Sequence, residues 1–132
     1  SKVTVSLTPK SSSKKFRRKR RGMIKVTIRR AADGSIRAVE VKGHAGYADP
    51  GKDIVCAGVS AVTVGTVNAV EALAGVVLPH EARDGFLAVN VPDIKDARLA
   101  EQVRLLLESM RVMLQTIEQS YGEFVAIVEK NE

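Results

Sequence analysis

The longest uncharged stretch of this chain, residues 54–70, places the strongest limit on its fold. It is rich in valine, but glycine, serine, threonine and asparagine interrupt it. A membrane span needs about 20 predominantly apolar residues, so the stretch is short and polar for one, and we expect no membrane partner. Asp53 is a suitable N-cap and Gly75 a suitable C-terminal stop. Although valine is a mediocre helix former, the stretch predicts a helix over residues 54–74 that packs closely against the rest of the domain.

A second helix is predicted over residues 96–121, where apolar residues recur at three- and four-residue steps. The apolar positions are Leu99, Val103, Leu106, Met110, Met113 and Ile117. Charged residues lie largely on the opposite side of this helix. A helix with one apolar stripe needs another layer of structure to cover that stripe.

Five short segments have the alternation or the β-branched content that is typical of strands. They are residues 23–30, 36–41, 76–82 and 86–91, and a last strand from Phe124. Asp33-Gly34 and Asp84-Gly85 are hairpin-turn sequences, and each joins two of these segments. The order ββαββαβ indicates an α+β fold in a single domain, with a mostly antiparallel sheet and two helices on one face.

The formal net charge of +6 is concentrated at one end of the chain. Residues 1–22 hold nine of the 21 lysines and arginines and no acid, which leaves 12 basic against 15 acidic residues in the rest. A polar, basic segment with little to bury is predicted to be flexible. We interpret residues 1–22 as a flexible basic leader and residues 23–132 as the folded domain. The leader is an added or upstream-translated segment, an electrostatic arm for RNA, or a transit-like peptide.

The single cysteine, Cys56, excludes an intramolecular disulfide and fits a reducing compartment. One cysteine and two histidines, His44 and His80, are too few for an ordinary structural zinc site without several carboxylates. We therefore expect neither a metal ion nor another cofactor. His80 comes just before a predicted turn, and we interpret it as a surface histidine.

Cys56 is the candidate nucleophile. With Asp53 as N-cap, the thiol falls in the first turn of the helix, where the macrodipole and free backbone N–H groups favour the thiolate. His44 lies in a glycine-rich loop that is long enough to bring its imidazole beside the sulfur. A cysteine paired with a histidine can act as nucleophile and general base. The alternatives are a cysteine that packs as a small apolar residue and a loop histidine without function.

The loop and the start of the helix contain a distinctive series of residues. It comprises Gly43-His44-Ala45, Ala48, Gly51, Asp53, Val55-Cys56-Ala57 and Val59-Ser60. This series closely resembles the pattern of the ribosomal-processing cysteine proteases called Prp. The expected order of strands and helices over residues 23–132 is also similar to that family, so the resemblance leaves out only the leader.

The resemblance implies a bacterial, cytoplasmic endopeptidase. Its substrate would be the precursor of a ribosomal large-subunit protein of the L-twenty-seven family, from which it removes an N-terminal extension. By position, Cys56 would be the nucleophile and His44 the general base and acid. Asp53 would either orient His44 or only cap the helix.

The resemblance also implies a homodimer and a glycine-rich loop that is mobile until the substrate docks. Residues expected to bind the substrate are Gly43, Gly46, Gly51 and Ser60. For Ser60, a hydroxyl that bonds back to its own helix is the alternative. We further expect backbone N–H groups at the helix start, including that of Cys56, to hold the oxyanion.

Two other functions fit the same residues. The first is a non-catalytic module that associates with ribosomes or RNA, in which the basic leader supplies salt-dependent affinity for nucleic acid. The second is a thiol sensor or an acyl-transfer enzyme that uses the same cysteine and histidine.

Overall fold

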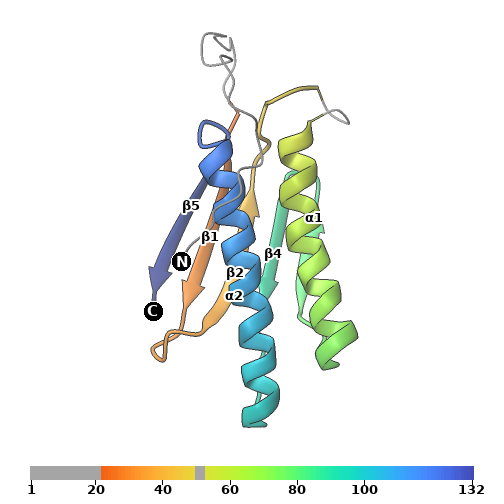
Figure 1. Ribbon diagram of the computed structural model, residues 1–132, viewed down its shortest axis with the longest axis vertical. Helices are drawn as coiled ribbons and strands as arrows, with labels where there is room; N and C mark the ends of the chain where they lie inside the picture. Colours follow the sequence, from red (N-terminus) through yellow and green to blue (C-terminus); the bar gives the residue numbers. More distant parts are fainter. Residues whose placement is uncertain (1–21, 50–52) are drawn as a thin grey trace, which may run out of the picture.

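The computed structural model describes residues 22–49 and 53–132. The predicted leader, apart from Gly22, and the candidate substrate-binding residue Gly51 lie outside the described residues. The fold is a five-stranded sheet with its helices on one face, as the sequence predicts (Figure 1).

The strands are β1 (Ile24–Arg30), β2 (Ile36–Lys42), β3 (His80–Arg83), β4 (Phe86–Asn90) and β5 (Val125–Asn131). Their order across the sheet is β3-β4-β2-β1-β5. All neighbouring pairs are antiparallel except β1 and β5, which run parallel. The two Asp-Gly turns join β1 to β2 and β3 to β4 in antiparallel hairpins, as expected from those sequences.

The helical layer consists of α1 (Ile54–Ala69), its π-helical continuation η2 (Val70–Ala74) and α2 (Ala97–Ser120). The alternating residues Ile24, Val26 and Ile28 of β1 are buried beneath this layer. The buried residues that the helices contribute are Val55, Val59, Thr63, Thr66, Val70, Val103, Leu107, Met110, Leu114 and Ile117. The core therefore lies between one face of the sheet and the two helices.

The helix over Ile54–Ala74 is long and apolar enough to cross a membrane by length and composition alone. In the structure it packs beside α2 and on the sheet (Figure 1). Only 28% of its most apolar window is buried, so much of its apolar surface faces outward.

The strand expected over residues 76–82 is shorter and begins only at His80. Gly75 ends the preceding helix in the left-handed conformation, with φ of 71°. Residues 76–79 then carry the chain from the helical layer to the edge of the sheet, with Leu78 fully buried on the way. Pro79 has no N–H group to donate to a neighbouring strand, so regular pairing starts after it.

Candidate active site

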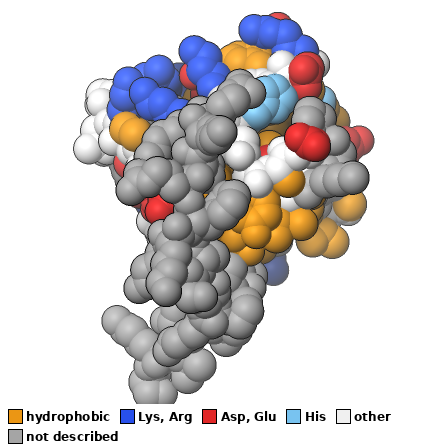
Figure 2. Space-filling model, turned by 90° about the horizontal axis from the view of Figure 1, so that it is seen from above, with side chains coloured by type: hydrophobic (Ala, Val, Ile, Leu, Met, Phe, Trp, Pro, Cys, Tyr) orange, Lys and Arg blue, Asp and Glu red, His pale blue; other side chains and the backbone are white. Residues whose placement is uncertain are grey.

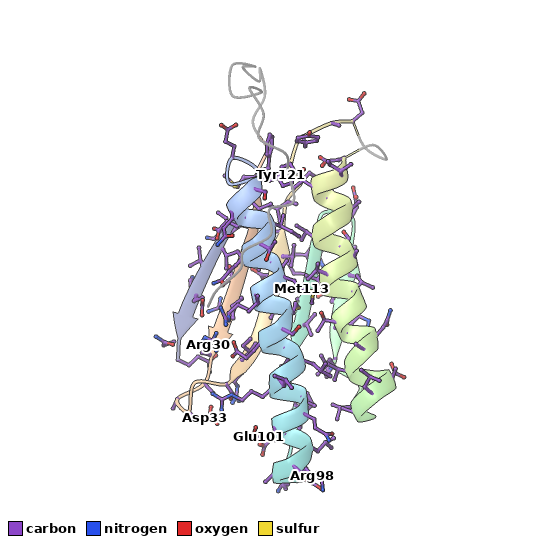
Figure 3. All side chains as sticks on the ribbon, viewed as in Figure 1. Arg30, Asp33, Arg98, Glu101, Met113 and Tyr121 are labelled. Carbon is purple, nitrogen blue, oxygen red and sulfur yellow. The ribbon has the colours of Figure 1, made fainter. Side chains whose placement is uncertain are left out.

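The candidate residues gather at one end of the sheet. Strand β2 ends there and leads into the loop that carries His44, while α1 begins there with Cys56 in its first turn. The turn between β3 and β4 reaches the same end, because the backbone N–H of Gly43 donates to the carbonyl of Gly85 at 2.8 Å. Tyr121, at the end of α2, lies near the start of α1 at this end of the molecule (Figure 3).

Asp53 organises both the helix and the loop. One carboxylate oxygen accepts from the backbone N–H groups of Val55 and Cys56, each at 3.0 Å, which is N-cap geometry. The other accepts from the N–H groups of Tyr47 and Ala48. Burial alone raises the pKa of Asp53, but these backbone donors outweigh it, so the pKa lies below its ordinary value.

Cys56 is half-buried, and its sulfur accepts a hydrogen bond from the backbone N–H of Ala45 at 3.2 Å. Burial raises the pKa of this thiol, the Ala45 donor lowers it, and the negative charge of Asp53 raises it further. The net shift is upward, which is opposite to the expectation that the first turn favours the thiolate. Burial is the main reason, and Asp53 adds to it because its carboxylate occupies the N–H groups that were expected to stabilise the sulfur.

His44 precedes the residue that donates to Cys56, but its ring faces the β3–β4 turn. The imidazole is 62% exposed, and its Nε2 lies 3.8 Å from a carboxylate oxygen of Asp84. Among the described residues, no hydrogen bond joins this ring to the sulfur of Cys56. In the structure, the backbone N–H of Ala45 therefore contacts the sulfur of Cys56, while the side chain of His44 points toward Asp84.

The remaining candidates occupy the loop and the outer side of α1. Gly43 and Gly46 both have positive φ, at 96° and 69°. A Cβ on Gly43 would lie 2.4 Å from the carbonyl oxygen of Met23, so only glycine fits where the loop leaves the sheet. Ser60 lies one turn beyond Cys56 on α1 and is exposed.

The second histidine, His80, makes its hydrogen-bond contact away from Cys56. In the structure His80 begins β3, and its Nδ1 lies 2.9 Å from the carbonyl oxygen of Leu78. This contact belongs to the hairpin and not to Cys56. In the described part of the chain, no group of three or more His, Cys, Asp or Glu residues could hold a metal ion.

Sequence reasoning missed an aromatic cluster and one acid. The ring of Tyr47 makes edge contacts with the rings of Tyr121 and Phe124, at centroid distances of 5.7 and 5.2 Å. These contacts hold the glycine-rich loop against the junction of α2 and β5. The chain has only five aromatic residues, and one of them, Tyr47, lies in a glycine-rich loop. This unusual position is the sequence feature from which the cluster could have been predicted. Asp84 gave no such signal, because Asp-Gly is already explained as a turn.

Figure 2 looks down on the molecule from the loop end and shows a histidine side chain at the surface, with acidic and basic side chains around it. The arrangement offers a thiol in the first turn of a helix and an exposed imidazole on the adjoining loop. These are the components of thiol-dependent catalysis.

Comparison with known proteins gives the same chemistry. The family described as Cysteine protease Prp matches residues 23–126. The ribosomal processing cysteine protease Prp of Bacillus subtilis is 44% identical over 103 residues, which cover 76% of this chain and 92% of that protein. The protein of the same name from Staphylococcus aureus is 35% identical over 107 residues, which cover 80% and 97% of the two chains.

Solved structures agree with the sequence comparison. The crystal structure of the S. aureus protease Prp with a covalently linked product peptide has a TM-score of 0.74 and 35% identity, and it covers 82% of this chain and all of that chain. A Streptococcus mutans protein has a TM-score of 0.68 and 32% identity, with 83% and 96% of the two chains covered. Since the family match extends over nearly all of the described fold and includes Cys56, this chain is a cysteine protease and belongs to the Prp family.

Proposed function

We propose that this protein is an endopeptidase that removes the N-terminal extension of a ribosomal large-subunit protein of the L-twenty-seven family in the bacterial cytoplasm. The relatives are named ribosomal processing proteases, and one of their structures holds a covalently linked product peptide. The observation that carries the proposal is the single cysteine in the first turn of α1, next to the histidine loop.

In this mechanism the Cys56 thiol gives its proton to the imidazole of His44, and the sulfur attacks the scissile carbonyl carbon. The resulting imidazolium protonates the leaving amine, which yields a thioester and the first product. His44 then takes a proton from water as the water attacks the thioester, and Cys56 is regenerated. Because the ring and the thiol are not hydrogen-bonded in the structure, substrate binding must bring them together.

The backbone N–H groups expected to hold the oxyanion already have acceptors in the structure. The N–H of Cys56 is already donated to Asp53, so it is not available at the helix start. The N–H of Ala45 is donated to the sulfur, and Ala45 is fully buried, so this group is also engaged before the substrate binds. A backbone N–H at the helix start can hold the oxyanion only if substrate binding frees it from its present partner.

A direct test is to incubate the protein with the extended ribosomal protein and to weigh the products by mass spectrometry. We expect one cut at the end of the extension by the wild type and none by Cys56→Ala, which should still fold and bind the substrate. Ser60→Ala, on the same helix, tests whether the hydroxyl contributes to substrate binding. An uncut substrate, or cutting by Cys56→Ala, would disprove the proposal.

The RNA-binding alternative makes a different prediction, because it places the function in the basic leader. A chain that lacks residues 1–21 should still cut the substrate if the protease proposal is correct. Gly22 is kept in this variant, since a Cβ on it would lie 2.6 Å from the carbonyl oxygens of His44 and Ala45, so its backbone packs against the loop. Loss of both RNA binding and substrate cutting on truncation would favour the alternative.

We also propose that the protein is a homodimer that uses the outer side of its helical layer. Large apolar side chains are exposed there, including Val64 on α1 and Leu105 and Val112 on α2. The outer side of α1 has no charged residue from Ile54 to Val70, and most of its apolar window is unburied. A second copy of the same surface would cover these side chains.

A further inference from the structure

The carboxylate that faces the candidate general base comes from the β3–β4 turn. Nε2 of His44 lies 3.8 Å from Oδ2 of Asp84, whereas both carboxylate oxygens of Asp53 accept from backbone N–H groups. Arg83, next to Asp84 in sequence, pairs with Glu81 at 2.6 Å and stacks over the ring of Phe86, so it is directed along the hairpin.

The backbone of the turn fixes the same end of the ring. A Cβ built on Gly85 would lie 2.8 Å from Nε2 of His44 and within 3.5 Å of both neighbouring ring carbons. Gly85 also holds the start of the loop, because its carbonyl accepts from the N–H of Gly43. The ring therefore rests with its Nε2 edge on the turn, at a position that a side chain would fill.

The position of the acid has a chemical consequence for the ring. The Asp84 carboxylate is 97% exposed and 3.8 Å from Nε2, so a small rotation would let it accept a hydrogen bond from Nε2. That bond favours the neutral tautomer that carries its proton on Nε2, which leaves the lone pair on Nδ1. A proton taken from the thiol is then accepted at Nδ1, and the positive charge that forms lies beside Asp84. In general, a histidine that acts as base is oriented by a third group on its other nitrogen.

We propose that Asp84 and Gly85 position His44, with Asp84 holding Nε2 so that Nδ1 receives the proton of Cys56. This inference rests on the proposed function for its catalytic consequence. It also assigns the orienting role, which the sequence left open for Asp53, to a residue of a different element.

The kinetic test compares variants of the β3–β4 turn with matched variants of the β1–β2 turn. Asp84→Asn is expected to lower kcat about two- to fivefold, as for an exposed ion pair, with KM unchanged. Asp84→Glu should recover most of this loss because it restores the carboxylate. The control is Asp33→Asn, since Asp33 also precedes a turn glycine but lies at the opposite end of the molecule from Tyr121 (Figure 3).

Gly85→Ala tests the backbone contact. Alanine would displace the ring, and we expect kcat to fall at least about tenfold. Alanine is also strained at the φ of 72° of Gly85, so Gly34→Ala is the control: Gly34 has φ of 88°, and a Cβ there meets only the end of the Arg104 side chain at 3.5 Å. The proposal is supported if both variants lose the same stability but only Gly85→Ala loses kcat. It is overturned if the two variants have equal kcat values.

A spectroscopic test separates this proposal from the proposed function. The chain has two histidines, so the imidazole ¹⁵N resonances of the whole protein can be assigned to two rings. Asp84→Asn should move the resonances of His44 and leave those of His80, which contacts Leu78, unchanged. Unmoved His44 resonances, or a kcat that rises in Asp84→Asn, overturn the inference even when the wild type cuts its substrate. Shifted His44 resonances support the inference even if the ribosomal substrate is not cut.

Discussion

The carboxylate of Asp53 accepts hydrogen bonds from the N–H groups of Tyr47, Ala48, Val55 and Cys56. Two of these groups belong to the helix that carries Cys56, the proposed nucleophile, and two belong to the loop that carries His44, the proposed base. Asp53 therefore links the start of α1 to the loop, and its carboxylate also interacts with the side chain of Cys56. Whether it serves the fold or the chemistry is decided by comparing the losses of stability and of rate when it is replaced.

Replacing Asp53 by alanine removes both sets of bonds. Asp96 offers a matched control, because it caps α2 through the N–H groups of Arg98 and Leu99 and makes no described contact with the loop. Asp96→Ala should lower the free energy of unfolding by about 1 kcal/mol, and Asp53→Ala by about 2 kcal/mol, as measured by urea denaturation. Only Asp53→Ala should also slow cleavage. A large loss of rate with unchanged stability would instead place Asp53 in the chemistry.

The pH dependence of alkylation tests the state of the nucleophile. Burial and the charge of Asp53 raise the pKa of Cys56, so iodoacetamide should react with a midpoint above the ordinary thiol value of about 8.5. Asp53→Asn should move the midpoint down, because it removes a nearby negative charge. The single cysteine lets mass spectrometry follow the reaction directly. A midpoint below 8.5 in the free enzyme would show that the thiolate is stabilised before the substrate binds.

At the residue scale, the sequence predicted the position of the N-cap and of the cysteine in α1 but not the orientation of the candidate side chains. Asp53 as N-cap and Cys56 in the first turn follow from local rules, and the structure has both. The direction of the His44 ring depends on Gly85 and Asp84, which are distant in sequence and reach it only through strand pairing. The upward shift in the pKa of Cys56 comes first from its burial and then from the nearby carboxylate of Asp53, and no sequence pattern reports how deeply the thiol is buried.

At the scale of elements, a charged cluster ties β1 to α2 and β5. Arg30 on β1 contacts Glu108 on α2 at 2.6 Å and Glu129 on β5 at 2.7 Å, and Arg111 also contacts Glu108. The Arg30 and Glu108 side chains are 17% and 25% exposed. The hydrogen bond from Arg30 is the main cause that lowers the pKa of Glu108 to about 2.

Glu108→Gln should lower the free energy of unfolding by about 1–3 kcal/mol at pH 7. The substitution removes the negative charge that pairs with the largely buried guanidinium of Arg30. The folded pKa of Glu108 lies below the unfolded value of about 4.3, so its contribution is complete above that value and is lost as pH falls toward about 2. Urea titrations from pH 7 to pH 2 should show the two proteins converging. Glu101→Gln, exposed on the same helix, should differ from the wild type by less than about 0.5 kcal/mol throughout.

The order and type of the elements were predictable because caps, glycines and hairpin turns mark their ends. Asp53, Asp96 and Gly75 end or begin helices where the sequence places them. The late start of β3 was not predictable from the alternation of residues 76–82. Leu78 is buried where the chain passes from the helices to the sheet, so an apolar residue is needed there although it is not part of β3. In the sequence, such a residue cannot be told from a buried strand residue.

At the scale of the whole molecule, the helical layer has two apolar sides. The inner side packs on the sheet, and the outer side leaves Leu105 71% exposed and Val64 47% exposed. Figure 1 shows both helices side by side on the same face of the sheet. Several exposed large apolar side chains on one layer are typical of an interface between protein chains.

Leu105→Asp and Val64→Asp should each weaken self-association at least about tenfold, because each would bury a charge in the proposed interface. Val77→Asp is the control, since Val77 is 62% exposed but lies in the connection after the helix. Sedimentation velocity over a concentration series measures the effect. A wild type that stays monomeric, or three variants with equal association, would contradict the homodimer proposal.

The parallel pairing of β1 with β5 affects how the enzyme becomes active during folding. Ile24 pairs with Val125 and Arg30 with Asn131, so these contacts must close about a hundred residues of intervening chain. The two hairpins close much shorter loops and should form earlier. Phe124, which touches Tyr47 of the catalytic loop, is positioned only when β5 docks. During refolding from urea, proteolytic activity should therefore return with the slowest phase, well after the helical circular dichroism has recovered.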